Sequence, residues 1–290
     1  MRFPQALSFG MGILLGARGS GAGPAARNVF VPPLTGELSG NFQPLQLAGA
    51  PELHWKIAFE LPAAEQRRAV FTAEGPGTRL RVELQLDAAG TGAWRLLEGR
   101  LELGPWLGGR ISSGRAELSG EGRIEGLALT GELVLKLHDV DLGELLALAD
   151  PEKAYVRTAS GRVQGTVGVR LRANAFGAGD SRLSLVPGTV ATLTFVPSPG
   201  LLTGYIPAQV LKAYPGIEAI EMGRTPLEAK VLALVFRPDG DSEGRGARVR
   251  IEGRPLDPKI IAPLELDVNF TGPLESVVRK ALDSRLKVKK

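Results

Sequence analysis

The residues best suited to catalysis are two histidines and a few carboxylates. Their spacing in the sequence matches no catalytic motif. His54 and His138 are the only histidines in the chain of 290 residues. Each falls on the charged side of a segment in which polar and apolar residues alternate, where side chains face solvent. A Ser-His-Asp hydrolase needs a histidine that a third group orients, and no such context is visible. We therefore expect both histidines to be ordinary surface residues.

Two groups of carboxylates resemble parts of binding sites. The run 239–244 begins like a calcium loop, but Arg250 occupies position twelve, where a bidentate glutamate is required. A polar hairpin turn explains this run better. Asp139 and Asp141 lie between an alternating segment and a helical one, where Asp141 suits a helix cap. We therefore predict no catalytic residue, no metal site and no cofactor, and we do not expect an enzyme.

Alternation of apolar and polar residues with a period of two dominates the chain. A β-strand points successive side chains to opposite faces, so each such segment has one apolar and one charged face. Segments of this kind occupy residues 52–60, 79–87, 127–138, 162–172, 247–252 and 264–270. Glycine-rich turns separate them, which is typical of antiparallel pairing. The sequence therefore predicts a mainly β fold, an antiparallel curled sheet that forms an open groove, with short helices.

Other segments depart from simple alternation. Residues 227–236 become apolar on both parities, which predicts a strand covered on both faces. Asp141 and Glu144 have the spacing of a capping box, and residues 206–213 have helical composition. Residues 273–287 carry one apolar stripe with basic flanks, which predicts a C-terminal amphipathic helix. That helix either caps the end of the sheet or lies on an anionic membrane surface.

Composition and charge narrow the classes of function. Hydrophobic residues make up 43% and charged residues 23%, as in a folded protein. The net charge of +4 is spread over many segments, so we expect no nucleic-acid partner. Cysteine is absent, which excludes disulfides and thiolate metal sites. Residues 1–29 are either a signal-like segment or a disordered leader, and residues 30–290 are expected to form one β domain.

The apolar strand faces allow two interpretations. If the sheet closes into a sandwich, these side chains are its core. If the sheet stays open, they line a channel in which acyl chains leave water at roughly 0.8 kcal/mol per methylene. The residues predicted to line such a groove are Leu80, Val82, Leu84, Leu129, Leu133, Leu135, Val167, Val169, Val249 and Leu266.

A distinctive block is Phe-Val-Pro-Ser-Pro-Gly-Leu-Leu at 195–202, followed by Ile206-Pro207 and by Pro-Leu-Glu at 226–228. These blocks resemble the C-terminal domain of the YdbH family of AsmA-like proteins. The segments 248–254 and 263–269 fit the same region, and the strand pattern of 96–137 is similar to that of AsmA-type proteins in general. The resemblance covers residues 30 to 290. Members of the family are several times longer and begin with a membrane anchor, so we expect a fragment or a truncated chain.

The resemblance implies a membrane-associated protein in the periplasm or cell envelope of a diderm bacterium. It implies a β-groove that carries phospholipid acyl chains between the inner and outer membranes, and a small outer-membrane lipoprotein partner near the C-terminal end. The alternative is a structural envelope scaffold with a closed β core, which pairs with a partner strand and carries no lipid. A carbohydrate-active enzyme is disfavoured because no convincing carboxylate pair is present.

Overall fold

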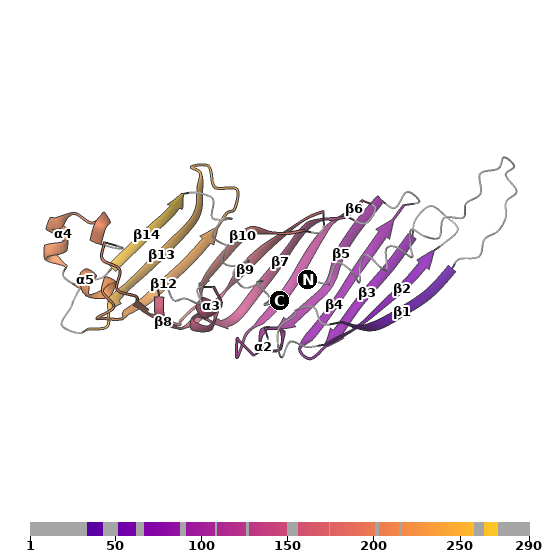
Figure 1. Cartoon of the computed structure of the whole chain (residues 1–290), viewed down its shortest axis with the longest axis horizontal. Helices are drawn as coiled ribbons and strands as arrows, with labels where there is room; N and C mark the ends of the chain where they lie inside the picture. Colours follow the sequence, from indigo (N-terminus) through magenta and orange to yellow (C-terminus); the bar gives the residue numbers. More distant parts are fainter. Residues whose placement is uncertain are drawn as a thin grey trace, which may run out of the picture. The chain divides into compact units, whose positions relative to one another are not determined.

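Antiparallel β-strands make up most of the protein, as Figure 1 shows for the computed structural model. The structure describes residues 34–42, 52–61, 67–87, 91–107, 109–125, 128–149, 156–173, 175–200, 203–214, 216–257 and 264–271. The strands are β1 (Leu34–Phe42), β2 (Leu53–Leu61), β3 (Arg67–Gly75), β4 (Thr78–Leu86), β5 (Thr91–Glu102), β6 (Arg115–Glu125), β7 (Ala128–Asp141), β8 (Val156–Ser160), β9 (Arg162–Arg172), β10 (Ala175–Leu185), β11 (Ala191–Phe195), β12 (Leu227–Phe236), β13 (Arg245–Pro255) and β14 (Leu264–Thr271). The expected mainly β, antiparallel fold is confirmed.

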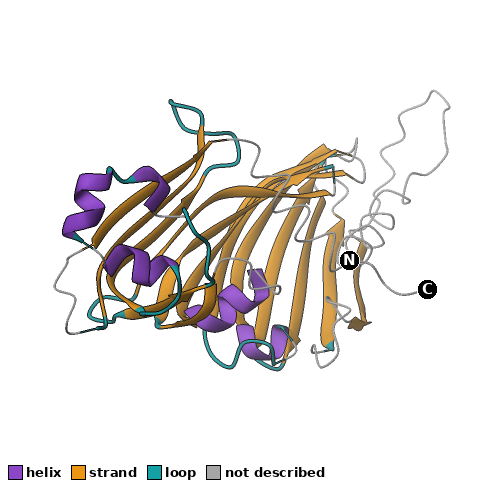
Figure 2. Cartoon of the chain, turned by 60° about the vertical axis from the view of Figure 1, so that its left-hand side comes forward, coloured by secondary structure: helices purple, strands orange, loops and turns teal. Residues whose placement is uncertain are grey.

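The helices are short and connect strands (Figure 2). They are α2 (Leu103–Trp106), α3 (Leu142–Ala149), α4 (Ala208–Ala213) and α5 (Gly216–Glu221), with a 3₁₀ turn at Thr203–Tyr205. The helix expected after Asp141 is confirmed as α3, because Glu144 N donates to Asp141 Oδ1 at 2.9 Å. The helix expected over 206–213 is α4. Residues 273–287, the predicted C-terminal helix, lie outside the described residues.

The described chain divides into two compact units. The first contains β1 to β6, α2, residues 128–135 of β7 and residues 168–177 of β9 and β10. Its sheet runs in sequence order from β1, so each hairpin packs beside the next. In the second unit β12 gives one edge to β13, which pairs with β14. The other edge of β12 is shared by β11 at its start and β10 at its end.

Rows of apolar side chains cross the first unit from strand to strand. Ile57 lies opposite Phe71, and Phe71 lies opposite Val82. These three side chains are between 0% and 6% exposed. Antiparallel partners point to the same face, so the alternation of each strand is converted into continuous rows across the sheet. The core of this unit is therefore laid out by strand register.

A bulge in β5 keeps these rows on one face. Arg81 pairs with Glu98 and Val82 with Leu96, so Leu97 is an extra residue. Trp94 and Leu101 are both buried, although one is an even-numbered and the other an odd-numbered position of the strand. Strict alternation would put them on opposite faces, and the bulge corrects the parity. The cost is visible at Leu97 itself, whose side chain is 44% exposed.

A second bulge explains the apolar run of β12. Ala229 pairs with Gly253 and Val231 with Glu252, which leaves Lys230 unpaired in the β13 ladder. Ala229 and Leu232 are therefore both buried. Val235 is only half-buried, in a row with charged residues of β10 and β13. The bulge thus explains why the buried parity changes along 227–236. The expectation that this strand is covered on both faces stays a prediction, since Val231 to Phe236 are buried or half-buried.

One part of the core of the second unit forms where α5 meets β11 and β13. Ile217 and Ile220 of α5 are 6% and 0% exposed. Leu193 of β11 pairs with Leu227 of β12, and these side chains are 3% and 0% exposed. The helix covers strands that lie at one end of the sheet, so it closes a core that the strands alone leave open.

Aromatic rings lie over glycines of the neighbouring strands. A Cβ on Gly36 would be 2.3 Å from the Phe59 ring, and one on Gly40 would be 3.0 Å from the Trp55 ring. Trp94 lies over Gly122 and Gly131 and donates from Nε1 to Thr130 O at 3.0 Å. The missing side chains leave space in which the rings lie flat against the sheet, as in the aromatic rescue of strand glycines.

This geometry predicts the outcome of filling one glycine. Gly122→Ala should lower the free energy of unfolding by about 2 kcal/mol, because the new methyl would meet Thr130 O and Trp94. Gly177→Ala is the matched strand control, since its nearest neighbour is Arg170 O at 3.8 Å. We expect urea unfolding to leave this control within about 0.5 kcal/mol of the wild type. Equal losses for the two variants would contradict the packing of Trp94 described here.

Candidate functional site: the apolar sheet face

Three of the residues predicted to line a groove lie side by side on β4. Leu80, Val82 and Leu84 are 4%, 6% and 2% exposed. They lie opposite Ala73, Phe71 and Ala69 of β3, on the same face of the sheet. The structure therefore brings these residues together on one apolar face, and they are buried there.

The predicted lining residues of β7 are less covered. Leu129 is 9% exposed, whereas Leu133 and Leu135 are half-buried. All three share the parity of Gly131. The Cδ2 atom of Leu133 would lie 2.7 Å from a Cβ on Gly120, so the leucine leans over this glycine of β6. On this face of β7, Gly131 contributes no side chain, and the aliphatic side chains of Leu133 and Leu135 remain partly exposed to solvent.

The remaining predicted residues lie on β9, β13 and β14. Val167 and Val169 share one face of β9 and are half-buried. Val249 is half-buried on β13 and lies between Leu234 of β12 and Val268 of β14 in register. Leu266 pairs with Ile251 in the adjacent row, and its side chain lies outside the described part. Val249 and Leu266 are therefore on the same face of neighbouring strands.

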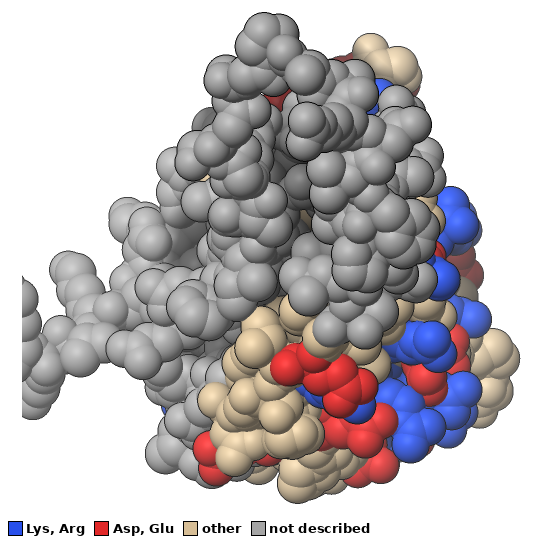
Figure 3. Space-filling view, turned by 90° about the vertical axis from the view of Figure 1, so that its right-hand side faces the viewer, with Lys and Arg blue, Asp and Glu red and all other residues tan. Residues whose placement is uncertain are grey.

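The opposite face of the first unit is charged and self-paired. Lys56 Nζ lies 2.8 Å from Glu37, and Arg68 Nε lies 2.5 Å from Glu83. Arg95 reaches Glu121 at 3.3 Å. Figure 3, viewed from the β1 side, shows cationic and anionic side chains intermixed over the described surface. Exposed pairs of this kind add little stability, but they keep this face in water.

The second unit repeats this division between its faces. Arg248 Nε donates to Asp267 at 2.8 Å, and this hydrogen bond lowers the pKa of Asp267. Arg250 reaches Glu265 at 3.1 Å. These groups alternate along β13 with the apolar row that contains Val249, so charge and aliphatic surface are separated by the pleat of the strands.

The polar run 239–244 is a hairpin turn between β12 and β13, as expected. Asp241 Oδ1 accepts from the backbone of Glu243 and Arg245 at 2.9 Å, and Oδ2 accepts from Arg245 Nε at 2.8 Å. The sequence Gly-Asp-Ser-Glu-Gly at 240–244 also matches the G-x-S-x-G motif of a nucleophile elbow. That motif requires a turn from a strand into a helix, and here the turn joins two strands. Ser242 is accordingly an exposed turn residue.

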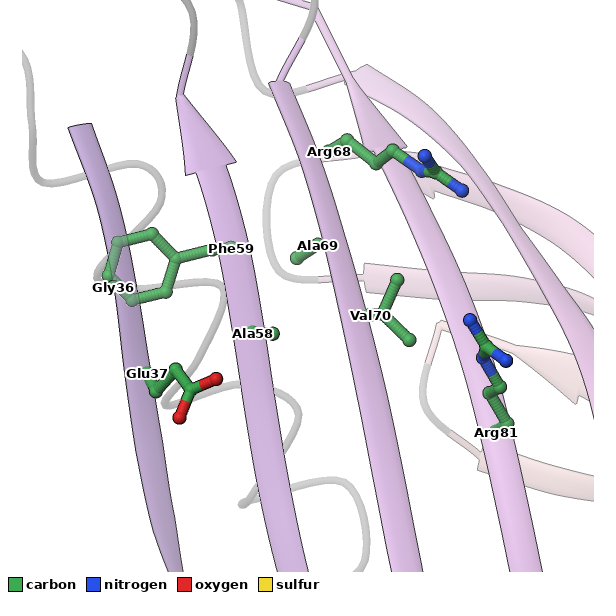
Figure 4. Close-up of a pocket in the computed structure, with 8 residues that line it drawn as sticks. All are labelled: Gly36, Glu37, Ala58, Phe59, Arg68, Ala69, Val70 and Arg81. Atoms are coloured by element: carbon green, nitrogen blue, oxygen red, sulfur yellow. The ribbon is translucent and has the colours of Figure 1, made fainter. Parts of the chain in front are cut away.

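A hollow with a volume of about 460 Å³ opens beside β1 to β4 (Figure 4). The side chains of Ala58 and Ala69 are small, and the Phe59 ring projects toward Gly36. Arg68 and Arg81 line the same hollow, and Arg68 already pairs with Glu83. The hollow is large enough for a small ligand, but it is shallow and contains no nucleophile next to a base.

A second hollow of about 520 Å³ lies between α4, α5 and the loop residues Pro199, Gly200 and Thr203. Glu221 lies in its wall and is only 2% exposed. Its carboxylate accepts from Gly200 N and Thr203 N, each at 2.7 Å, and from Thr203 Oγ1 at 3.1 Å. These contacts assign Glu221 a role in holding the Pro-Ser-Pro-Gly loop. Sequence reasoning missed it, although an acidic residue at a helix C-terminus, where the dipole disfavours it, was a signal.

The candidate catalytic and metal-binding groups do not assemble within the described residues. His54 Nδ1 lies 3.0 Å from Asn41 Oδ1 on an exposed face. Asp139 has a positive φ of 53°, and its carbonyl accepts from Arg162. No group of three metal-ligating side chains occurs among the residues that the structure describes. The described part of the chain also has no helix long and apolar enough to cross a bilayer.

Comparisons with known proteins add no relative. No protein family, curated protein or solved structure is significantly similar to this chain.

The two glutamates of α5 provide a matched test of that loop. Glu221→Ala should cost about 3 kcal/mol of unfolding free energy, because Gly200 N and Thr203 lose a buried acceptor. Glu218→Ala removes only an exposed pair with Arg224, so we expect a change within about 0.5 kcal/mol. Thermal and urea unfolding measure both variants. Similar stabilities for the two would rule out the role assigned to Glu221.

The turn at 239–244 predicts a pH dependence. Hydrogen bonds from the backbone and side chain of Arg245 lower the pKa of Asp241 from 3.8 to about 2. The pKa is lower in the folded state, so the stabilisation is complete above pH 3.8 and disappears as the pH falls toward 2. The difference in unfolding free energy between wild type and Asp241→Asn should therefore shrink over this range. The Ser242→Ala control should show a difference that does not change with pH.

Proposed function

We propose that this chain forms part of an apolar β-groove that conducts phospholipid between the inner and outer membranes of a diderm envelope. The observation that carries the proposal is the composition of the inward strand face. In β4, β5 and β6, and again in β9 and β10, the positions on the side of the buried apolar residues contain no Asp, Glu, Lys or Arg, while the opposite positions carry ion pairs. Charged residues of the apolar parity lie at strand ends, as Arg67 does at the start of β3, opposite Leu86. A guest that lies along the middle of these strands would meet mainly apolar surface.

The chemistry of this face favours acyl chains over other guests. Leu133, Leu135, Val167 and Val169 are half-buried aliphatic residues, and they offer neither hydrogen-bond donors nor charge. An acyl chain gains roughly 0.8 kcal/mol for each methylene that leaves water, and it needs no polar partner. A phospholipid head group would stay near the charged edges of the strands.

The resemblance to the C-terminal domain of the YdbH family supports the same proposal. By this resemblance we infer a periplasmic, membrane-associated chain with a small outer-membrane lipoprotein as partner near the C-terminal end. In this role the chain has no catalytic residue and no cofactor. Its contribution is a surface along which lipid moves.

A scaffold without lipid is the second candidate, and one observation favours it. Leu80, Val82 and Leu84 are at most 6% exposed, and Phe71 beside them is 0% exposed. Burial of this extent is typical of a sealed core. In this alternative the sheet is structural, and a partner pairs with one of its edge strands.

Site-specific photocrosslinking in diderm cells separates the two candidates. A photoreactive residue in place of Leu133 or Val169 should give phospholipid adducts, detected by mass spectrometry of the purified protein. The matched controls are Glu132 and Arg170, which are next to these positions in sequence but lie on the opposite, charged face. There Arg170 Nε lies 3.8 Å from Glu132 Oε1. We expect adducts at least about tenfold more abundant at the apolar positions, the ratio that a transfer difference of about 1.5 kcal/mol gives.

Two outcomes would remove the transport proposal. One is the absence of both lipid adducts and co-purified phospholipid, which the scaffold predicts. The other is equal labelling at Leu133 and Glu132, which would indicate that lipid contacts the protein without regard to face.

A further inference from the structure

Among the strands that the structure describes, β1 has an edge whose own residues lack the usual protection against pairing. It ends the strand order, and among the described strands it pairs only with β2. Its register with β2 runs over all nine residues without a bulge. Natural edge strands are commonly blunted by proline, lysine, bulges or short length. In contrast, the edge strand β8 has five residues, and β14 carries Glu265 and Asp267.

The residues of β1 are compatible with pairing to themselves. Gly36, Leu38 and Gly40 lie on the apolar face, and Glu37 is the only charged residue of the strand. A strand with glycine placed symmetrically about a central leucine presents nearly the same edge from either direction. We propose that two copies of this chain join through β1, antiparallel, about a two-fold axis at Leu38.

We call the junction of the two β1 strands the seam. This register places compatible residues opposite each other on both faces of the seam. Leu38 lies opposite Leu38 of the second copy, Gly36 opposite Gly40, and Glu37 opposite Ser39. Every pair keeps its parity, so apolar residues meet on one face and polar residues on the other. A two-fold axis at Glu37 would place two like charges opposite each other, which is unfavourable.

The neighbouring strand adds apolar contact across the seam. Leu38 pairs with Ile57 of β2, which is 2% exposed, so the row through Phe71 and Ile57 would continue into the second copy. The Phe59 ring lies over Gly36 and the Trp55 ring over Gly40. Pairing Gly36 with Gly40 brings the Phe59 ring of one copy toward the Trp55 ring of the other. The apolar sheet face thus becomes continuous over two chains.

Substitutions of opposite charge at Ser39 test the seam and separate an effect on dimerisation from an effect on the stability of the monomer. Ser39 pairs with Lys56 within its own chain and would face Glu37 of the second copy. Ser39→Glu therefore favours the folded monomer but places like charges across the seam, and we expect the dimer Kd to rise about fivefold. Ser39→Lys is repelled by Lys56 within the chain but is attracted across the seam, so the Kd should fall about fivefold. Sedimentation equilibrium of the full chain measures both constants.

Introduced thiols test the register, because the chain contains no native cysteine. Glu37→Cys and Ser39→Cys place single thiols on the exposed side of β1. The proposed register brings these two positions directly opposite each other only when the two variants are mixed. We expect oxidation of the mixture to give a disulfide-linked dimer, and oxidation of either variant alone to give much less.

A wild-type chain that sediments as a monomer at every concentration up to its solubility limit would overturn the proposal. So would a dimer in which Ser39→Glu and Ser39→Lys shift the Kd in the same direction. Cross-linking that is equal in the mixture and in the single variants would exclude the register at Leu38. None of these results bears on lipid binding, which rests on different residues.

Discussion

Strand register is the constraint on which the structure depends. Alternation gives each strand one apolar face, but only pairing in the right register joins these faces into rows such as Ile57, Phe71 and Val82. A slip of one residue would turn every apolar side chain toward water. The bulges at Leu97 and Lys230 preserve the rows where the sequence departs from alternation. Cross-strand ion pairs on the opposite face, such as Lys56 with Glu37, reinforce the same register.

The sequence was sufficient to predict the fold class, the strands with clear alternation and the helix that Asp141 caps. It was sufficient because alternation and capping depend on neighbours along the chain. The sequence did not single out β1, β3, β8, β10 or β11, in which apolar and polar residues alternate less regularly. The bulge at Leu97 could not be located in advance, since its effect appears only when β4 and β6 are both paired. The burial of Leu80, Val82 and Leu84 likewise depends on what lies over the face, which periodicity does not record. Glu221 was missed because its partners lie in a loop far back in the sequence.

Glycine has a particular part in building the apolar face. Where Gly36, Gly40 and Gly122 remove a side chain, an aromatic residue of the next strand covers the exposed backbone. The apolar area of the face increases because these aromatic rings cover the backbone at the glycines. Aliphatic side chains such as Leu133 lean over glycine in the same way. Glycines of one strand thus make room for the larger apolar side chains of the next.

The carboxylate of Glu221 also sets an order of events during synthesis. The chain leaves the ribosome from its N-terminus, so Gly200 and Thr203 emerge well before their acceptor, which follows Gly200 by 21 residues. The backbone donors of this loop therefore remain hydrated until α5 has been made. Once Glu221 docks, the last segment of the loop and the helix that covers β11 become fixed together. This corner of the protein therefore becomes ordered only after the residues of α5 have been made.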